Sequence, residues 1–229
     1  YNQTNGTFTI AKINSSGNIN WSKRFTGINW FSFQPAGLAV NADGDILVLG
    51  GAPHYGNTGV LRFDGETGER IGMGTMSMSR RFTTNDIEPT DDGGYLIVGS
   101  LERSGGHFAE DLSIAKFNES DELEWFYKYQ DDLSTVGLGI YEMEDSYVIV
   151  GDGYFPIFYI RINKDDGLPQ KVRTYQFDQE GTTNGFFRPT NKVGNTLYFS
   201  GTYTSPRDFS TETFLGSLDL GEGDWNWAM

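Results

Sequence analysis

Short apolar runs that end on glycine recur along this chain at a nearly constant spacing. The clearest run is Tyr95 to Gly99, which follows the tight acidic turn Asp91 to Gly94. Similar runs end at Gly50, Gly151 and Gly201, so that successive terminal glycines lie 49, 52 and 50 residues apart. A period near 50 residues in a chain of short strands indicates a repeat architecture.

Each repeat contains four predicted strands, which we call A to D in chain order. They are runs of β-branched and aromatic residues between clusters of Gly, Asp and Asn. The strands are expected at 37–41, 46–52, 59–63 and 69–75 in the first full repeat; at 86–90, 95–101, 112–117 and 123–129 in the second; at 137–143, 147–152, 157–162 and 170–175 in the third; and at 185–190, 196–202, 213–218 and around Trp225 in the fourth. Half a repeat precedes them, with a C strand at 7–13 and a D strand at 19–25.

This organisation predicts an all-β chain with the β-propeller fold, built from four-stranded antiparallel blades. We expect a single domain, 1–229, whose half-blade and four full blades lie at approximately 1–27, 28–77, 78–130, 131–178 and 179–229. An isolated half-blade would leave a sheet edge open to aggregation. The pattern therefore indicates a fragment of a larger propeller, with about five to eight blades in the parent protein.

Two sequence motifs carry a resemblance to a known group of proteins. The run Asp91 to Gly99, followed by Leu112 to Phe117 and by Glu124-Trp125, resembles the repeats of secreted bacterial and archaeal β-propellers, where a DGGY-type strand precedes a hairpin with a lysine and a tryptophan. Ile10 to Trp21 matches the hairpin, and the turn Asp64 to Gly68 is similar to that of quinoprotein-like and kelch-like repeats. The resemblance implies the fold and leaves the activity open, because propellers host many functions.

Charge and composition exclude several classes of function. The net charge of −14, from 31 acidic and 17 basic residues, argues against nucleic acid and anionic lipid as partners. No apolar run approaches the roughly 20 residues that a membrane helix needs. The chain has no cysteine, which excludes disulfides, thiolate metal sites and cysteine nucleophiles.

The links between strands B and C and between D and A are longer than the Asp/Asn/Gly turns of the other two connections. In an antiparallel blade these longer links emerge at one end, and long links tend to carry function. Their aromatic, basic and histidine side chains are the candidate binding residues: Trp30, His54, Tyr55, Arg103, His107, Tyr154, Phe155 and Arg207. The alternative is that these side chains pack the links against one another.

We interpret the protein as a non-catalytic, extracellular or cell-surface module. It would bind a protein or a glycan, or build an assembly with further blades or copies, through the B–C and D–A links. The alternative is a carbohydrate-active or quinone-dependent propeller enzyme, for which paired carboxylates such as Asp86, Glu88 and Glu142 could act on a glycosidic bond. Two histidines cannot form a three-His metal site, and no motif supports a Ser-His-Asp triad.

No cofactor is predicted. Ca²⁺ is the candidate ion for the acidic turns Asp43 to Asp45, Asp91-Asp92 and Asp165-Asp166. None of them completes the oxygen-ligand spacing of an EF-hand loop, and Asp and Gly favour hairpin turns for backbone reasons alone. Turn chemistry is the preferred interpretation.

Some recurring residues are predicted to be structural. Successive C strands carry one cation each, Lys12, Arg62, Lys116 and Arg161, which we expect to pair with carboxylates on neighbouring strands. Large rings recur in the D strands at Trp21, Trp125 and around Trp225, and we expect them to dock between blades.

Five sequons make N-glycosylation a further prediction, in keeping with a secreted protein. The acceptor residues are Asn2, Asn5, Asn14, Asn20 and Asn118. Asn14 and Asn118 occupy equivalent C–D turns, which we expect to be exposed.

Overall fold

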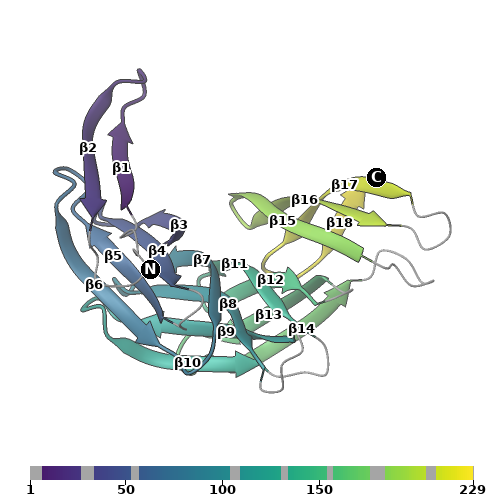
Figure 1. The fold of residues 1–229 in the computed structure, drawn as a ribbon. Helices are drawn as coiled ribbons and strands as arrows, with labels where there is room; N and C mark the ends of the chain where they lie inside the picture. Colours follow the sequence, from purple (N-terminus) through teal and green to yellow (C-terminus); the bar gives the residue numbers. More distant parts are fainter. Residues whose placement is uncertain are drawn as a thin grey trace, which may run out of the picture. The chain divides into compact units, whose positions relative to one another are not determined.

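The computed structural model describes residues 7–26, 34–52, 57–103, 109–129, 134–153, 157–175, 184–204 and 210–228, and every regular element in these ranges is a β-strand (Figure 1). A hairpin comes first, followed by four sheets that we call blades I to IV. The hairpin is β1 (Thr7–Ile13) and β2 (Ile19–Thr26); blade I is β3 (Gln34–Val40), β4 (Ile46–Ala52), β5 (Asn57–Phe63) and β6 (Arg70–Ser77); blade II is β7 (Phe82–Pro89), β8 (Tyr95–Glu102), β9 (Glu110–Phe117) and β10 (Leu123–Tyr129); blade III is β11 (Val136–Glu142), β12 (Ser146–Asp152), β13 (Ile157–Asn163) and β14 (Pro169–Tyr175); blade IV is β15 (Asn184–Val193), β16 (Thr196–Thr204), β17 (Thr211–Asp219) and β18 (Trp225–Ala228).

Each blade is a meander of four strands in which every strand pairs with its neighbours in the sequence. The pairing is antiparallel in the strand pairs of the hairpin and of blades I, III and IV. The predicted architecture of four full blades and half a blade is therefore confirmed. No helix in the described ranges is long and apolar enough to cross a membrane.

The first strand of each blade departs most from its prediction. β7 begins at Phe82, four residues before the expected start, so Asp86 lies inside the strand and does not open it. The D–A link expected from Met76 to Asn85 is therefore shorter, because β6 ends at Ser77 and β7 begins at Phe82. The reason is a bulge: the register of β7 shifts between Thr84 and Asp86, and a bulge of this kind interrupts the period of two on which strand prediction depends. The other three A strands are also bulged, between Pro35 and Gly37, Gly137 and Gly139, and Pro189 and Asn191.

Close backbone approach explains why the repeated apolar run ends on glycine. A Cβ added to Gly99 would lie 2.0 Å from the carbonyl oxygen of Thr83 on strand β7. The same addition at Gly151 would bring Cβ to 2.2 Å from the carbonyl oxygen of Val136 on β11. These separations are far inside van der Waals contact, so the second strand of a blade can lie against the first only where the side chain is absent.

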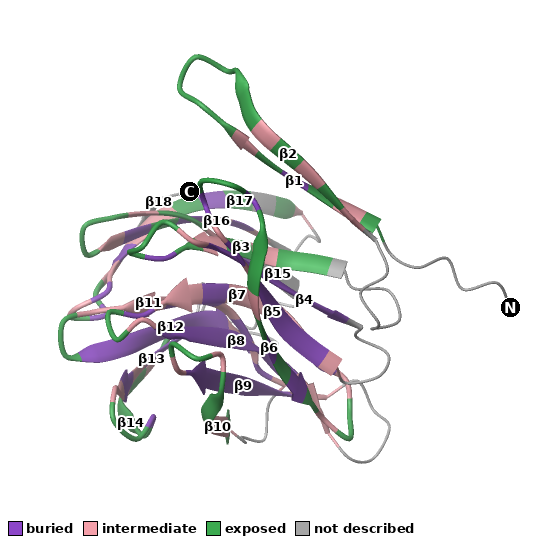
Figure 2. Ribbon diagram, turned by 90° about the vertical axis from the view of Figure 1, so that its left-hand side faces the viewer, coloured by how far each residue is buried: buried purple, intermediate pink, exposed green. Residues whose placement is uncertain are grey.

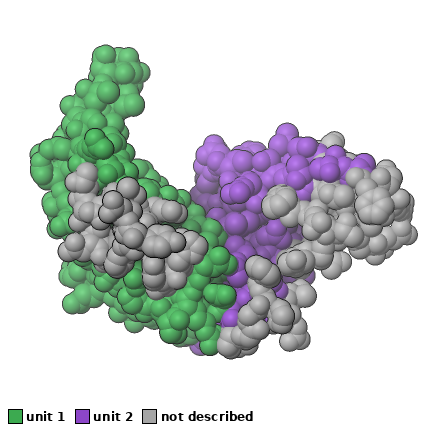
Figure 3. All heavy atoms as spheres, in the orientation of Figure 1, with its two compact units in different colours: residues 1–102, 114–127 green, residues 103–113, 128–229 purple. Residues whose placement is uncertain are grey.

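The chain forms two compact units, residues 1–102 with 114–127 and residues 103–113 with 128–229, and each contains an apolar layer between two successive blades (Figure 3). In the first unit, blade I contributes Leu47, Leu49 and Val60 to a layer that also holds Tyr95, Ile97 and Phe117 of blade II. In the second unit, blade III contributes Val148, Val150 and Tyr159 to a layer that holds Leu197, Phe199 and Phe214 of blade IV. Figure 2 shows strands β8 and β12 as buried, whereas much of the hairpin β1–β2 is exposed. Burying one apolar side chain of this size contributes about 1.5–3 kcal/mol to the free energy of folding. These layers are therefore a main source of stability for the blades.

The predicted pairing of the C-strand cations with carboxylates is confirmed, but the nearest carboxylates lie in turns of the same or the next blade and not on neighbouring strands. Lys12 donates to the carbonyl oxygen of Gly65 and to Glu66, Arg62 pairs with Asp121, and Arg161 pairs with Asp145. Lys116 is 2% exposed and reaches Asp92 at 2.7 Å.

The large rings of the D strands were expected to dock between blades, and two of the three contact a neighbouring blade. Trp21 donates to the carbonyl oxygen of Gly65 in the next blade, and Trp225 stacks on Tyr175 of the preceding one, whereas Trp125 contacts Tyr127 in its own strand.

Candidate functional site

Polar groups at one end of the blades are used mainly to cap the backbone. We call the end that holds the A–B and C–D turns the turn end, and the end that holds the B–C and D–A links the loop end. At the turn ends, side-chain oxygens cap backbone N–H groups. In the C–D turns the capping residues are Asn14, Asp64, Asn118, Asn163 and Asp219. Such caps favour a single turn conformation.

The acidic turns that suggested Ca²⁺ use their oxygens in the same way. Asp92 accepts hydrogen bonds from Thr90, from the Gly94 N–H and from Lys116, and these bonds lower its pKa although partial burial acts in the opposite direction. Asp166 accepts the N–H of Leu168. The described parts of the chain hold no group of three or more His, Cys, Asp or Glu side chains placed to bind a metal ion.

The sequons fall into three structural situations. Asn14 and Asn118 are capping residues whose Oδ1 atoms each accept two backbone N–H groups. Asn20 lies on an exposed position of β2. Asn2 and Asn5 lie outside the described residues. Glycosylation at any of the five stays a prediction.

Of the candidate binding residues, the structure describes Arg103. The other seven lie outside the described residues: Trp30, His54, Tyr55, His107, Tyr154, Phe155 and Arg207. Arg103 lies at the loop end of blade II, where its Nε donates to Oδ1 of Asp111 at 2.5 Å. Asp111 is fully buried, and Lys128 places its Nζ 3.1 Å from the second carboxylate oxygen. That second contact is an ion pair without hydrogen-bond geometry, since Oδ2 has no hydrogen-bond partner.

This buried carboxylate lies where the B–C and D–A links of the blade meet. The N–H of Thr135 donates to the carbonyl oxygen of Glu110, and the N–H of Leu112 donates to the Thr135 hydroxyl. Ser134 accepts the N–H of Glu110 at 3.0 Å. Arg103 is therefore part of a structural cluster that stabilises the loop end, and its role in binding stays a prediction.

Asp152 is a site residue that the sequence interpretation missed. It ends strand β12 at the loop end of blade III, opposite Val136 on β11. Burial raises its pKa to about 6, although a hydrogen bond from the Gly153 backbone acts in the opposite direction. A carboxyl group that titrates near pH 6 is suited to proton transfer. One signal was present in the sequence: the residue after the repeat glycine is Gly51, Ser100 or Thr202 in the other blades and is acidic here alone.

Replacing Asp152 by asparagine should change how stability depends on pH. The pKa in the folded state is about 6 and exceeds the ordinary value of 3.8, so the folded protein holds the proton more tightly than the unfolded chain. The associated stability is complete below the ordinary pKa and is lost as the pH rises through about 6. We therefore expect Asp152→Asn to match the wild type near pH 4 and, allowing for partial solvent exposure, to exceed it by on the order of 1–2 kcal/mol at pH 8.

Urea unfolding at a series of pH values measures this difference. Asp43→Asn, at an exposed carboxylate of a turn, controls for the general effect of removing one negative charge. A stability difference for Asp152→Asn that does not vary with pH would contradict the assignment.

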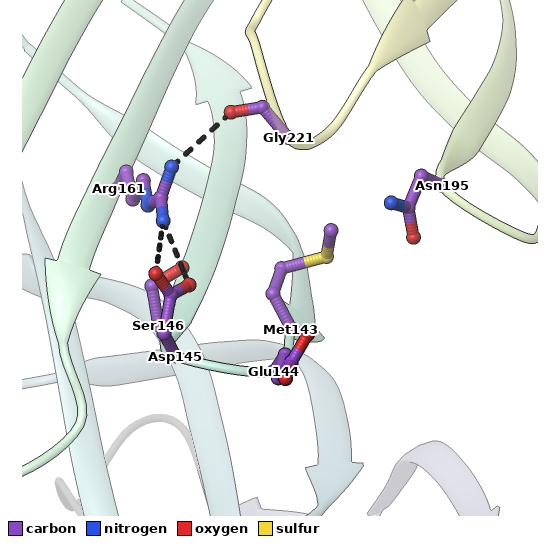
Figure 4. A pocket seen from close by; sticks show the side chains of 7 residues that line it. All are labelled: Met143, Glu144, Asp145, Ser146, Arg161, Asn195 and Gly221. Atoms are coloured by element: carbon purple, nitrogen blue, oxygen red, sulfur yellow. Dashed lines mark hydrogen bonds and ion pairs between the residues drawn. The ribbon is translucent and has the colours of Figure 1, made fainter.

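A pocket of about 480 Å³ lies at the turn ends of blades III and IV (Figure 4). Arg161 projects from β13 and donates two bonds to Asp145, at 2.7 and 2.8 Å, and one to the carbonyl oxygen of Gly221. Asn195 lies on the opposite side of the pocket. A hydrogen bond from Ser146 and the charge of Arg161 lower the pKa of Asp145. The sequence interpretation placed Arg161 in the structural ladder and made no prediction of a pocket beside it.

Two of the carboxylates considered for glycosidic chemistry, Glu142 and Asp86, have partners within their own blades. Glu142 pairs with Lys164 at 2.7 Å, at the turn end of blade III. Oδ1 of Asp86 accepts the N–H of the next residue, Ile87, at 2.9 Å.

Comparison with solved structures supports the assignment of the fold. No family model and no curated protein matches the chain. A protein of unknown function from Bacteroides caccae superposes over 93% of the chain and 71% of its own, with a TM-score of 0.56 and 13% identity. The Dos1 propeller superposes over 96% and 64%, with a TM-score of 0.50 and 10% identity.

This chain is a β-propeller. A further neighbour is an α-L-arabinofuranosidase from Lactobacillus brevis, with a TM-score of 0.51 and 12% identity over 86% of the chain and 73% of that protein. Identities this low establish the fold alone, because propellers with one architecture carry unrelated activities. The chain spans about two thirds of the Dos1 propeller.

Proposed function

We propose that this propeller is a non-catalytic, extracellular or cell-surface module that binds a protein or glycan through the loop ends of its blades. The length and the composition of the links at the loop ends carry the proposal. At the turn ends, polar side chains cap the backbone or join neighbouring strands and blades, as Asn14, Lys12 and Lys116 do. The longer links at the loop ends hold the aromatic and basic side chains that interfaces favour.

Replacing Tyr55, Tyr154 and Arg207 together with alanine should weaken partner binding at least about tenfold, since each substitution at a binding hot spot costs more than 1 kcal/mol. The melting temperature should change by less than about 2 °C, because the proposal assigns these links to partner binding and not to the core, and substitutions outside a core rarely exceed 0.5 kcal/mol. Binding of the fluorescent protein to a glycan microarray and to cells of the source organism provides the measurement. Protease treatment of the cells removes a protein partner, and periodate treatment removes a glycan.

Arg70→Ala is the matched control, since Arg70 is an exposed arginine at the turn end of blade I. Its binding should equal that of the wild type. Undiminished binding by the triple variant would contradict the proposal.

The location outside the cell rests on the sequons and on the resemblance to secreted propellers. Asn14 and Asn20 are exposed, whereas Asn118 is half-buried in a turn whose next residues, Glu119 and Ser120, are exposed. The mass of the native protein should then fall after enzymatic removal of N-glycans, and an unchanged mass would remove this support.

A carbohydrate-active enzyme is the second candidate, and Asp152 is the observation that favours it. A carboxyl group with a pKa near 6 can act as a general acid at neutral pH. Release of nitrophenol from a panel of aryl glycosides tests the idea. Turnover that Asp152→Asn abolishes would favour the enzyme over the binding module.

A further inference from the structure

The pocket at the turn ends of blades III and IV has no part in the proposed loop-end interface. Its volume of about 480 Å³ lies within the range of about 300–1,000 Å³ that is usual for small-molecule sites. Its lining comes from the A–B turn and strand β13 of blade III and from both turns of blade IV. Both blades belong to one compact unit.

Short A–B turns leave room for this pocket. The N–H of Met143 donates to the carbonyl oxygen of Ser146, so the turn of blade III encloses two residues. The turn of blade IV, between the paired residues Val193 and Thr196, also encloses two. The turns of blades I and II each enclose three residues, Ala42 to Gly44 and Asp91 to Gly93. A shorter turn covers less of the end of its blade.

One wall of the pocket is a preorganised polar pair. Arg161 donates two hydrogen bonds to Asp145, and the fully buried Ser146 donates a third at 3.1 Å. A carboxylate has about four acceptor sites, so one site on Asp145 remains for a ligand. Because these bonds orient the carboxylate in advance, a ligand that binds it loses little free energy to ordering the side chain.

The opposite wall carries Asn195, and Met143 lies between the two walls in the view of Figure 4. The side-chain amide of Asn195 offers two donors and one acceptor oxygen. Met143 is half-buried and packs against the apolar layer between blades III and IV. The pocket therefore combines hydrogen-bonding walls with an apolar surface between them.

The charges of the lining disfavour an ionic ligand. An anion would face the carboxylates of Glu144 and Asp145. The nearby cation, Arg161, already donates to Asp145 and to the carbonyl oxygen of Gly221. A cationic ligand would in turn lie beside the Arg161 guanidinium. A neutral ligand with neighbouring hydroxyl groups meets neither repulsion, and each hydroxyl can both donate and accept, as this mixture of polar groups requires.

We propose that this pocket binds a neutral sugar unit, with its hydroxyl groups bonded to Asp145 and Asn195 and the C–H face of its ring on Met143. The site goes beyond the proposed loop-end interface and does not depend on it, because it lies at the opposite end of the blades.

Titration of isotopically labelled protein with methyl glycosides of neutral hexoses and pentoses, followed by amide NMR shifts, tests this proposal. We expect at least one glycoside, at millimolar concentration, to shift the amide signals of Glu144, Asp145 and Asn195. Asn195→Ala should weaken that binding about fivefold or more, since it removes the hydrogen bonds of one wall. Asn191→Ala, at an exposed position of β15 in the same blade, is the matched control and should bind the glycoside as the wild type does.

Three outcomes would overturn the proposal. The first is that no glycoside shifts the signals of the pocket, and the second is that Asn195→Ala binds as tightly as the wild type. The third is that acetate or tetramethylammonium shifts these signals and the glycosides do not, which would show that the pocket binds an ion. The loop-end interface has its own test in the triple variant at Tyr55, Tyr154 and Arg207, so failure of one proposal can be told from failure of the other.

Discussion

Alanine in place of Gly99 is expected to destabilise the propeller by about 3 kcal/mol or more, because the added Cβ overpacks a backbone contact. The new atom would lie 2.0 Å from the carbonyl oxygen of Thr83. That oxygen belongs to β7, which pairs with β8 along its length and cannot retreat without breaking hydrogen bonds to it. A loss of this size is a large part of the 5–15 kcal/mol that stabilises a typical domain.

Urea unfolding monitored by circular dichroism measures the loss. Gly37→Ala is the matched control: Gly37 lies in β3 near a strand bulge, but its added Cβ would make contacts of 3.4 Å or longer, all with side-chain atoms. We expect the control to cost less than about 1 kcal/mol. Similar urea midpoints for Gly99→Ala and Gly37→Ala would contradict the prediction, because they would show that β7 and β8 can pair as closely with alanine at position 99.

The second large effect is expected at Asp111. Asp111→Ala should cost about 2–4 kcal/mol, since it removes a fully buried carboxylate and leaves two cations without their partner. The cost is below the upper end for buried pairs because Arg103 and Lys128 keep 21% and 33% of their side-chain surface in water. Asp111→Asn retains the shape and should recover part of the loss.

A double-mutant cycle with Arg103→Ala separates this pair from general disruption. Coupling between the two substitutions should be about 1 kcal/mol or more. Glu69→Ala serves as the control, because the exposed pair between Lys23 and Glu69 should contribute less than about 1 kcal/mol. A purely additive cycle would show that Arg103 does not stabilise the loop end through Asp111.

Arg103 also shows how stability and binding can be told apart at the loop end. If the side chain is structural, Arg103→Ala lowers the free energy of unfolding and leaves binding intact once the protein is folded. The triple variant at Tyr55, Tyr154 and Arg207 has the opposite expectation, with binding lost and stability retained. The two results together test which residues of the links contact a partner.

Local chemistry made most of the strands predictable. Hairpin turns rich in Asp, Asn and Gly separate runs of β-branched and aromatic residues, and both signals depend on residues close together in the sequence. Strand β4 was predicted without error, and most other B, C and D strands agree to within one or two residues. The A strands agree less well because a bulge such as that between Thr84 and Asp86 disturbs the alternation.

The sequence by itself determined the repeat, its period, the number of blades and the structural role of the C-strand cations, because each recurs in register with the repeat glycines. Tertiary structure decided the rest. The clash that requires glycine at position 99 involves Thr83 on another strand, the pKa of Asp152 depends on burial by the folded chain, and the pocket beside Arg161 is completed by Asn195 and Gly221 of the next blade. Each of these properties depends on atoms that are distant in sequence, and only packing brings them together.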